Sequence, residues 1–196
     1  MRLLIATTNH GKVHEYQQIF NGLSCELASL FEVGITQEVA EAGSTYEENA
    51  ILKAQEYAGL SGLLTLADDS GLEVDALNGR PGVYSARYAA DSPTRIRQLL
   101  AEMQKVPADQ RSARFQCVIA LAHPDGRTEI TAGTCEGYIT AEARGTNGFG
   151  FDPVFYVPEY GMTMAELPEE IKNQISHRAR AAQKMYPILE RILMEG

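Results

Sequence analysis

Two adjacent aspartates, Asp68 and Asp69, come directly after a short apolar run and are the first candidates for chemistry. Carboxylates at the end of a strand suit a hard cation such as Mg²⁺, which one or two carboxylates hold while substrate phosphates complete its coordination. The same pair could position a water molecule, or it could end a strand in an Asx-type turn. Because adjacent strand residues point to opposite faces, we expect one aspartate to face a site and the other to be structural.

A second candidate is the polar segment Thr7–Lys12, which lies between a predicted strand and a predicted helix. Backbone amides at the N-terminus of a helix attract anions, and a lysine at that point adds a full positive charge. The segment is not a P-loop, because Ala6 and Val13 stand where that motif requires glycine and serine or threonine. The alternative is a polar strand-to-helix turn with a solvated lysine.

Two further segments carry aromatic and basic residues. In Gly148–Pro153, glycines permit a close backbone approach and a phenylalanine could stack on a nucleobase, although a tight loop with core phenylalanines fits the same pattern. In Lys172–Arg178, a lysine, a histidine and an arginine gather at the start of a predicted helix. Cations at that end oppose the helix dipole, which favours a bound anion or polar ligand; the alternative is a solvated basic turn.

Composition limits the classes of protein. The chain has 196 residues, of which 44% are hydrophobic and 22% charged, and its net charge is -9. An acidic protein gains nothing from long-range attraction to nucleic acid or anionic lipid, so we expect neither nucleic acid nor a membrane as a partner. A phosphate ligand would therefore need a local basic site or a metal.

Cysteine usage and hydropathy indicate the compartment. Cys25, Cys117 and Cys135 are widely spaced and odd in number, which argues against a disulfide framework and fits a reducing environment. The apolar start is too short for a signal peptide, and no stretch is long enough to span a bilayer. We expect a cytoplasmic protein.

Hydrophobic periodicity and turn residues predict an α/β chain without a linker or repeat, and hence a single domain over residues 1–196. Thr45 and Glu48 have the spacing of a capping box, so a helix is expected from there to about Ala58. Ser176 could cap the last helix, which Pro187 should kink or interrupt. The other expected elements are strands 2–7, 63–67, 115–122 and 128–138, the last two forming a hairpin, and helices 12–21 and from 92 onward.

Taken together, the four segments supply a metal carboxylate, three cationic contacts and a stacking loop. That set is what a nucleoside triphosphate site needs. The sequence lacks HExxH, GxSxG and Cys–His motifs, so metal-assisted hydrolysis is the leading chemistry.

In their order along the chain, these segments resemble the inosine/xanthosine triphosphate pyrophosphatases, house-cleaning enzymes that remove deaminated purine nucleotides. The likeness covers nearly the whole chain, and the ordered set is far more specific than any one segment. The matching segments are 6–12, 45–53 with Glu48-Asn49-Ala50, 67–72, 79–88, 148–153 and 176–178.

The resemblance implies cleavage of ITP, dITP and XTP between the α and β phosphates, which releases pyrophosphate and a nucleoside monophosphate. It also implies Mg²⁺ dependence and a homodimer. The implied fold is α/β and two-lobed: helices flank a long, twisted, mixed β-sheet, and the active-site cleft lies between the lobes.

By the same resemblance, Asp69 would bind Mg²⁺ and act as general base on the attacking water, with Ser70 on the substrate beside it. Lys53 would add a phosphate contact. The residues that would hold the triphosphate are Thr7, Thr8, Asn9, His10, Gly11 and Lys12. The residues that would frame the base, with one ring stacked on it, are Phe149, Gly150, Phe151 and Asp152. The residues that would recognise its 6-oxo edge or nearby groups are Lys172, His177 and Arg178.

The chain departs from the family pattern at one position. The family usually has a glutamate three residues before the glycine that here is Gly43, and this chain has Ala40 there. Glu41 is our choice for the second metal carboxylate, because a one-residue adjustment of the loop could bring it in. Asp68 is the other candidate.

Two alternatives remain open from the sequence. Ala40 at the usual glutamate position motivates a nucleotide-binding module without catalysis, which would bind ITP and never turn it over. A related enzyme for a pyrimidine or modified nucleotide, as in the septum-formation family of similar fold, is the other. A substrate panel separates both from the purine triphosphate pyrophosphatase.

Overall fold

The computed structural model describes residues 1–195, which form two compact units assembled from separate stretches of the chain. The first unit contains Met1–Asp69, Cys117–Gly133 and the chain from Arg178 onward. The second unit contains Ser70–Gln116 and Thr134–His177. This confirms the two-lobed α/β class; the placement of a cleft between the lobes and the count of one domain stay predictions.

Seven strands form one mixed sheet in the order β2-β1-β3-β4-β5-β6-β7. Strand β1 pairs in parallel with both β2 and β3, whereas β6 pairs in antiparallel fashion with β5 and β7. The strands are β1 (Arg2–Ile5), β2 (Glu26–Ser29), β3 (Leu64–Val74), β4 (Ser112–Ala122), β5 (Thr128–Ile139), β6 (Phe155–Val157) and β7 (Met162–Thr163).

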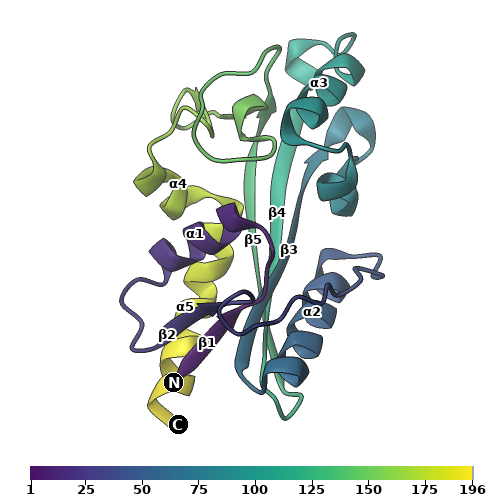
Figure 1. The fold of residues 1–196 in the computed structure, drawn as a ribbon. Helices are drawn as coiled ribbons and strands as arrows, with labels where there is room; N and C mark the ends of the chain where they lie inside the picture. Colours follow the sequence, from purple (N-terminus) through teal and green to yellow (C-terminus); the bar gives the residue numbers. More distant parts are fainter. Residues whose placement is uncertain (196) are drawn as a thin grey trace. The chain divides into compact units, whose positions relative to one another are not determined.

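The first unit is a sheet covered on both faces, as expected for parallel strands. Successive side chains of β1 point to opposite faces. Leu3 and Ile5 pack with residues of α1 (His10–Ile19) and α5 (His177–Glu195), whereas Leu4 packs with α2 (Tyr46–Ser61). Figure 1 shows α1 and α5 on one side of β1 and α2 on the other.

The second unit has its own core under the remaining halves of the long strands. Leu72 and Val74 of β3 pack with Leu99 of α3 (Ser92–Glu102) and with Phe155. The rings of Phe115 and Phe155 lie 4.4 Å apart between centroids, close enough for a favourable aromatic contact. Helix α4 (Glu169–Ile175) follows at the end of this unit.

Local capping explains where helices begin. The predicted capping box is confirmed, because Thr45 accepts a hydrogen bond from the Glu48 amide and Glu48 reaches back to the Thr45 amide. Helix α1 begins at His10, two residues before the predicted start, since the Asn9 side chain accepts hydrogen bonds from the amides of Gly11 and Lys12.

Other predicted boundaries were wrong. Strand β3 does not end near Ala67 but continues through both aspartates to Val74, because Leu72 and Val74 are core residues of the second unit. Pro187 does not interrupt α5, which is a single helix from His177 to Glu195; a kink at Pro187 stays a prediction. The hairpin is confirmed, with the His123 amide bonded to the Arg127 carbonyl at its turn.

Short elements escaped prediction altogether. Strands β2, β6 and β7 have four, three and two residues, and helix α4 has seven, so none is long enough to show a hydrophobic period. Among the described residues, no helix combines the length and apolar character needed to cross a membrane.

Candidate active site

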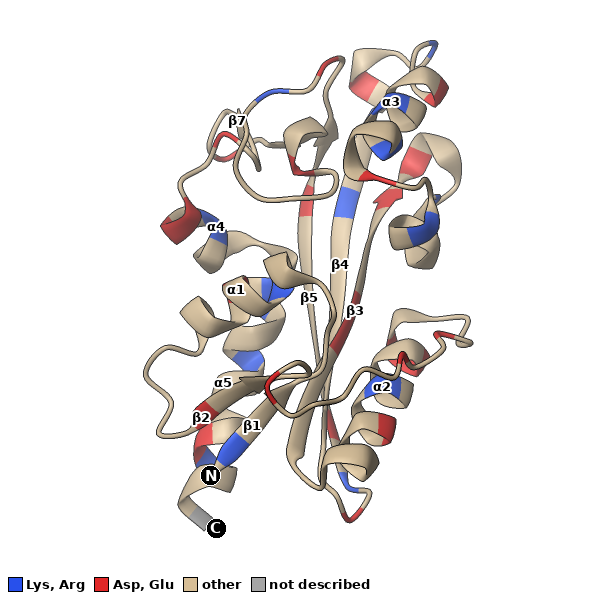
Figure 2. Ribbon diagram, viewed as in Figure 1, with Lys and Arg blue, Asp and Glu red and all other residues tan. Residues whose placement is uncertain are grey.

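The two aspartates lie in the middle of β3, beside the end of β1. Because these strands are parallel, the chain that leaves Ile5 runs alongside the β3 residues that follow Leu66. The Ala6 amide still bonds the Leu66 carbonyl at 2.7 Å, and the polar loop begins at the next residue. The sheet topology therefore brings the start of α1 next to Asp68, and Figure 2 shows acidic β3 between basic segments of α1 and α2.

Asp69 faces α2. Its Oδ2 atom accepts a hydrogen bond of 2.9 Å from Asn49, and its Oδ1 atom lies 3.9 Å from the Lys53 ammonium. Lys53 also contacts Glu41 at 2.5 Å. The structure thus brings together three residues that the sequence singled out, Asp69, Lys53 and Glu41, on one face of the first unit.

Asp68 faces the opposite side and meets α1 and α5. Its Oδ2 atom lies 2.8 Å from the Lys12 ammonium and 3.5 Å from the Arg178 guanidinium. Arg178 is 1% exposed and also pairs with Glu15 at 2.6 Å. Adjacent residues of one strand therefore serve two different networks, as the alternation of strand side chains requires.

The two networks give the aspartates different protonation behaviour. Burial raises the pKa of Asp69 above its usual value, and the charge of Lys53 and the Asn49 hydrogen bond only partly oppose this effect. Burial also acts on Asp68, but the charges of Lys12, Arg178 and Lys53 outweigh it and hold the pKa well below the usual range. Asp68 is a fixed anion, and Asp69 is the better proton acceptor of the two.

The donor set around Asp69 fits a hard divalent cation that phosphates help to coordinate. Among the side chains that the structure describes, no group of three or more His, Cys, Asp or Glu residues is arranged to hold a metal unaided. Asp69 and Glu41 supply two carboxylates, and both contact the same ammonium of Lys53, so positive charge is already favoured between them. Two carboxylates completed by substrate oxygens are typical of Mg²⁺ sites.

Asp68 fits the metal role less well. One of its oxygens is occupied by the Lys12 and Arg178 contacts, and the other, Oδ1, is buried and accepts no hydrogen bond from any residue of the described chain. Two cations, Lys12 and Arg178, contact that one oxygen of Asp68, whereas Glu41 and Asp69 share the single ammonium of Lys53. Glu41 therefore has the better surroundings for a second carboxylate, although its role stays a prediction.

Several groups of the predicted phosphate loop, Thr7–Lys12, form hydrogen bonds with one another. The Asn9 side chain takes up the amides of Gly11 and Lys12, and the Asn9 amide itself bonds the Thr7 hydroxyl at 3.2 Å. Thr8, Asn9 and His10 are exposed. The loop has the placement expected of an anion site at a helix N-terminus, and its contacts with a triphosphate stay a prediction.

The glycine-rich loop of the second unit is built around one buried ion pair. Lys172 lies 2.5 Å from Asp152, whose Oδ2 atom also accepts a hydrogen bond from the Phe149 amide. The Lys172 ammonium lies 4.8 Å from the centre of the Phe149 ring. Gly148 has a φ of +71°, and a Cβ atom there would lie 2.1 Å from Asp152 Oδ2, so the loop requires glycine.

The two phenylalanines of this loop have different roles. Phe151 is a core residue that meets the Tyr88 ring edge-on, which fits the simpler interpretation of the motif. Phe149 is partly exposed and is the ring better placed to stack on a ligand. His177, also of the second unit, is stacked on Phe115 with 4.6 Å between ring centroids.

Sequence reasoning assigned no role to two residues that the structure places in these networks. Asn49 is fully buried and bridges Asp69 and the Gly43 amide. Its spacing of four residues from both Thr45 and Lys53 on α2 was the available signal, because such residues share a helix face. Glu15 lies three residues after Lys12 on α1, which is the same kind of signal.

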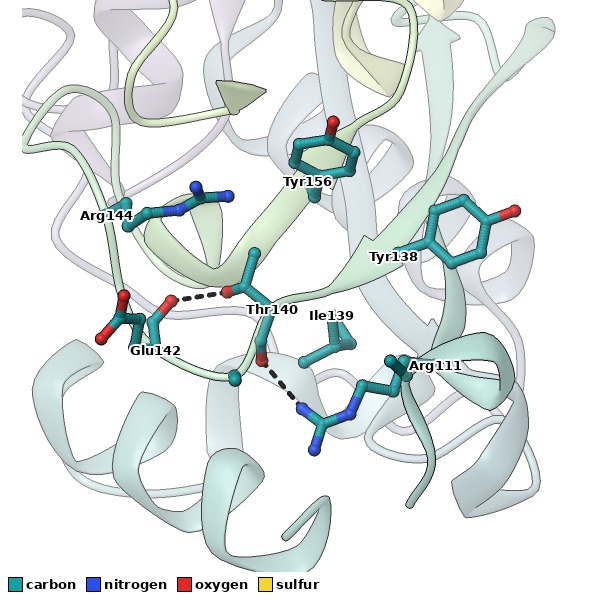
Figure 3. Close-up of a pocket in the computed structure, with 9 residues that line it drawn as sticks. Arg111, Tyr138, Ile139, Thr140, Glu142, Arg144 and Tyr156 are labelled. Atoms are coloured by element: carbon teal, nitrogen blue, oxygen red, sulfur yellow. Dashed lines mark hydrogen bonds between the residues drawn. The ribbon is translucent and has the colours of Figure 1, made fainter. Parts of the chain in front are cut away.

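A separate hollow of about 540 Å³ lies in the second unit and includes none of the predicted site residues. Figure 3 shows the Arg111 guanidinium directed at the Thr140 carbonyl and Arg144 beside the Tyr156 ring. Arg111 also donates to the Met103 carbonyl at 2.9 Å, so it ties backbone segments together. We therefore assign the chemistry to the cluster around Asp69.

The fold and this site define an α/β protein whose first unit pairs the adjacent carboxylates of Asp68 and Asp69 with lysines of two helices, Lys12 and Lys53, an arrangement suited to a metal–phosphate ligand. The chain belongs to the Ham1 family, whose sequence model matches residues 3–188. This confirms the resemblance that the ordered motifs indicated.

Similar proteins agree with that assignment. A dITP/XTP pyrophosphatase of Desulforamulus reducens is 50% identical over 195 residues, which cover 98% of this chain and 97% of the relative. One of Bacillus cereus is 49% identical over 189 residues, or 94% and 92% of the two chains. The Ham1 protein structure from Staphylococcus aureus superposes with a TM-score of 0.86 at 42% identity, covering 98% of this chain and 100% of that one. A HAM1 protein from Coxiella burnetii gives a TM-score of 0.86 at 41% identity over 100% of both chains.

Proposed function

We propose that this protein hydrolyses the deaminated purine nucleoside triphosphates ITP, dITP and XTP to a nucleoside monophosphate and pyrophosphate. The observation that carries the proposal is the cluster of Asp69, Glu41, Lys53 and Asn49 on one face of the first unit. Family membership supports it, because the Ham1-family relatives from D. reducens and B. cereus bear the name dITP/XTP pyrophosphatase. Such an enzyme removes damaged purines from the nucleotide pool.

In this proposal Asp69 accepts a proton from the attacking water, and Asn49 and Lys53 hold its carboxylate in place. Asp69 and Glu41 would hold Mg²⁺, which, when bound, neutralises phosphate charge and orients the reacting groups. Lys12 and the loop Thr7–Gly11 bind the triphosphate oxygens. Lys53 adds a further positive charge beside the phosphates.

Base recognition is assigned to the second unit and to the start of α5. Phe149 stacks on the purine, and Lys172, His177 and Arg178 act on its 6-oxo edge or on groups nearby. Buried donors that face a 6-oxo group would be left without an acceptor by a 6-amino group, and such mismatches discriminate by roughly 10⁴–10⁵. Adenine nucleotides are therefore poor substrates in this proposal. Ser70 and Asp152 are assigned the remaining contacts with the substrate.

The remaining parts of the proposal concern the working state of the enzyme. We assign Mg²⁺ as the metal, a homodimer as the assembly and the cytoplasm as the location. The wide spacing and odd number of the three cysteines, Cys25, Cys117 and Cys135, suit a reducing compartment. Neither nucleic acid nor a membrane is expected as a partner.

The decisive experiment is a pyrophosphate-release assay over the common and deaminated nucleotides, with Mg²⁺ and with EDTA. We expect release from ITP, dITP and XTP, little from ATP, and none after chelation. Release of single phosphate, or activity indifferent to EDTA, would contradict the reaction. Binding of ITP without turnover at any metal concentration would favour a binding module, and preference for a pyrimidine nucleotide would reassign the substrate.

A further inference from the structure

Glu15 is a buried carboxylate that no step of the proposed reaction uses. It lies on α1, is 4% exposed, and contacts the Arg178 guanidinium of α5 at 2.6 Å. Lys12 lies three residues earlier on the same helix, so the two side chains share a face. The position of Glu15 links a helix that begins at the predicted phosphate loop to the first turn of α5.

Glu15 is one end of a continuous run of alternating charges. Arg178 contacts Glu15 through Nη1 and Asp68 through Nη2, at 2.6 Å and 3.5 Å. Asp68 in turn contacts the Lys12 ammonium at 2.8 Å. The order is therefore Glu15, Arg178, Asp68 and Lys12, and all four belong to the first unit. The two acidic and two basic groups balance, which burial of charge requires.

Packing alone does not explain this arrangement. A buried ion pair is weak evidence for stability, because well-packed apolar residues of similar volume often stabilise a fold as well or better. The apolar core of this unit already joins α1 and α5 through residues such as Tyr16 and Met185. A buried run of charges that ends at a partly exposed lysine can also fix the position of that lysine.

Removing the Glu15 charge would disturb the balance of charges at the other end of this run, where Asp68 contacts Lys12. Arg178 would then depend more strongly on Asp68. The contact between the Arg178 guanidinium and Asp68 is 3.5 Å long and has room to shorten. Both cations compete for the same Asp68 Oδ2 atom. A carboxylate drawn toward Arg178 holds Lys12 less firmly, so the lysine would lose its fixed position.

We propose that Glu15 is a positioning residue: by holding Arg178 it fixes Asp68, and through Asp68 it places the Lys12 ammonium that binds the substrate phosphates. The inference rests on the proposed function, because it assigns the phosphate contact to Lys12. It adds that the affinity of the site for phosphate depends on a residue that touches no substrate.

The test is a double-mutant cycle with Glu15→Gln, Lys12→Met and the combined variant. The kinetic readouts are KM and kcat for dITP with Mg²⁺, and the binding readout is calorimetry with inorganic tripolyphosphate. We expect Glu15→Gln to raise KM and weaken tripolyphosphate binding by roughly tenfold, the size of one charged contact, while kcat changes little. The combined variant should be no worse than Lys12→Met alone, because residues that act through each other are not additive.

A merely structural role gives a different pattern. It would lower the folded fraction, so the apparent kcat would fall with KM unchanged, and the effects of the two substitutions would add. Either result overturns the inference. Glu26→Gln is the control, because it removes a carboxylate from an exposed ion pair with Arg2 in the same unit and should leave KM unchanged.

A conservative variant keeps the test valid if Glu15→Gln folds poorly. Glu15→Asp retains the charge with a shorter reach, and it should give a KM between those of the wild type and Lys12→Met. If the wild type releases no pyrophosphate from any nucleotide, the proposed function fails. The double-mutant cycle can then still be measured by the binding of tripolyphosphate. A wild type that also binds no tripolyphosphate removes Lys12 as a phosphate contact and overturns the inference.

Discussion

Asp68 and Asp69 are neighbours in β3, yet their carboxylates bind partners on opposite faces of the sheet. Asp68 contacts Lys12 of α1 at 2.8 Å, and Asp69 accepts a hydrogen bond of 2.9 Å from Asn49 of α2. Asp68 therefore has cationic partners that keep it ionised. Asp69 shares the Lys53 ammonium with a second carboxylate, Glu41. The same substitution at the two positions should have different consequences.

Asp69→Asn should abolish most turnover while leaving nucleotide binding measurable. An amide cannot accept the proton of the attacking water, and loss of a general base costs roughly 10²–10⁴ in rate. Pyrophosphate release measures kcat, and calorimetry with dITP measures binding. Asp125→Asn in the exposed hairpin turn is the control. Full activity of Asp69→Asn would remove Asp69 from the role of base.

Asp68→Asn should destabilise the fold, in addition to loosening the Lys12 ammonium that Asp68 holds. It leaves Lys12 and Arg178 without a shared acidic partner, and breaking a buried ion pair costs about 3–5 kcal/mol. Urea denaturation followed by circular dichroism gives the free energy of unfolding. A change below about 1 kcal/mol, the size typical of exposed ion pairs, would show that this network contributes little to stability.

Glu41→Gln should raise the Mg²⁺ concentration needed for half-maximal activity. Loss of one anionic ligand weakens metal binding, and we expect a shift of roughly tenfold or more. The exposed Glu38, three residues away, provides the control substitution Glu38→Gln. If Asp68→Asn shifts the Mg²⁺ curve and Glu41→Gln does not, the second carboxylate is Asp68.

Two glycines of one loop offer a matched comparison. Gly150→Ala meets no atom within 4 Å but has a φ of +63°, so it should cost about 1–2 kcal/mol for the left-handed backbone. Gly148→Ala has a similar φ of +71° and also forces a Cβ atom against Asp152 and Lys172. Thermal denaturation should show a further loss of about 1–3 kcal/mol for Gly148→Ala. Equal stability of the two variants would contradict the close packing of this ion pair.

Tyr88 should titrate later than an ordinary tyrosine. Burial and the hydrogen bond to Glu102 raise the pKa of Tyr88 from 10.0 to about 12. The folded state therefore keeps a proton that the unfolded chain loses, so the stabilisation is complete below pH 10.0 and declines as the pH rises toward about 12. Ultraviolet absorbance of tyrosinate measures the titration, and Tyr88→Phe should remove this late component. If Tyr88→Phe instead removed a component that titrates near pH 10.0, the pKa of Tyr88 would be that of an ordinary tyrosine.

Thiol reactivity should distinguish the three cysteines. Cys117 and Cys135 are buried, and burial beside the Asp68 charge raises the pKa of Cys117 far above its usual value. Only Cys25 is partly exposed, although burial raises its pKa as well. Ellman's reagent should modify one thiol in the folded protein and three in denaturant, and Cys25→Ser should abolish the reaction of the folded protein. Rapid modification of Cys117 would contradict its placement.

The parts of the site that depend on local sequence could be predicted. Thr45 and Glu48 satisfy each other's backbone amides within one helical turn, so their spacing alone revealed the start of α2. The strand alternation that separates Asp68 from Asp69 is equally local, and it correctly implied two different environments. The ordered motifs also identified the family.

The long-range pairings could not be predicted in the same way. Glu15 and Arg178 are 163 positions apart, and nothing in either neighbourhood indicates that their charges meet. The end of β3 was misjudged because Asp68 and Asp69 are typical of a turn, whereas the core of the second unit draws the strand onward to Leu72 and Val74. Tertiary packing overrode local preference at both places.

The interleaving of the two units has a consequence for synthesis on the ribosome. The chain passes from one unit to the other after Asp69, Gln116, Gly133 and His177, so neither unit is complete when the first half of the chain has emerged. Met185 and Leu189 of α5 fill the core beneath β1, the strand that is translated first. Strand β1 can therefore complete its packing only after α5 has been synthesised. A nonsense codon that deletes only α5 should yield an aggregation-prone product rather than a smaller working enzyme.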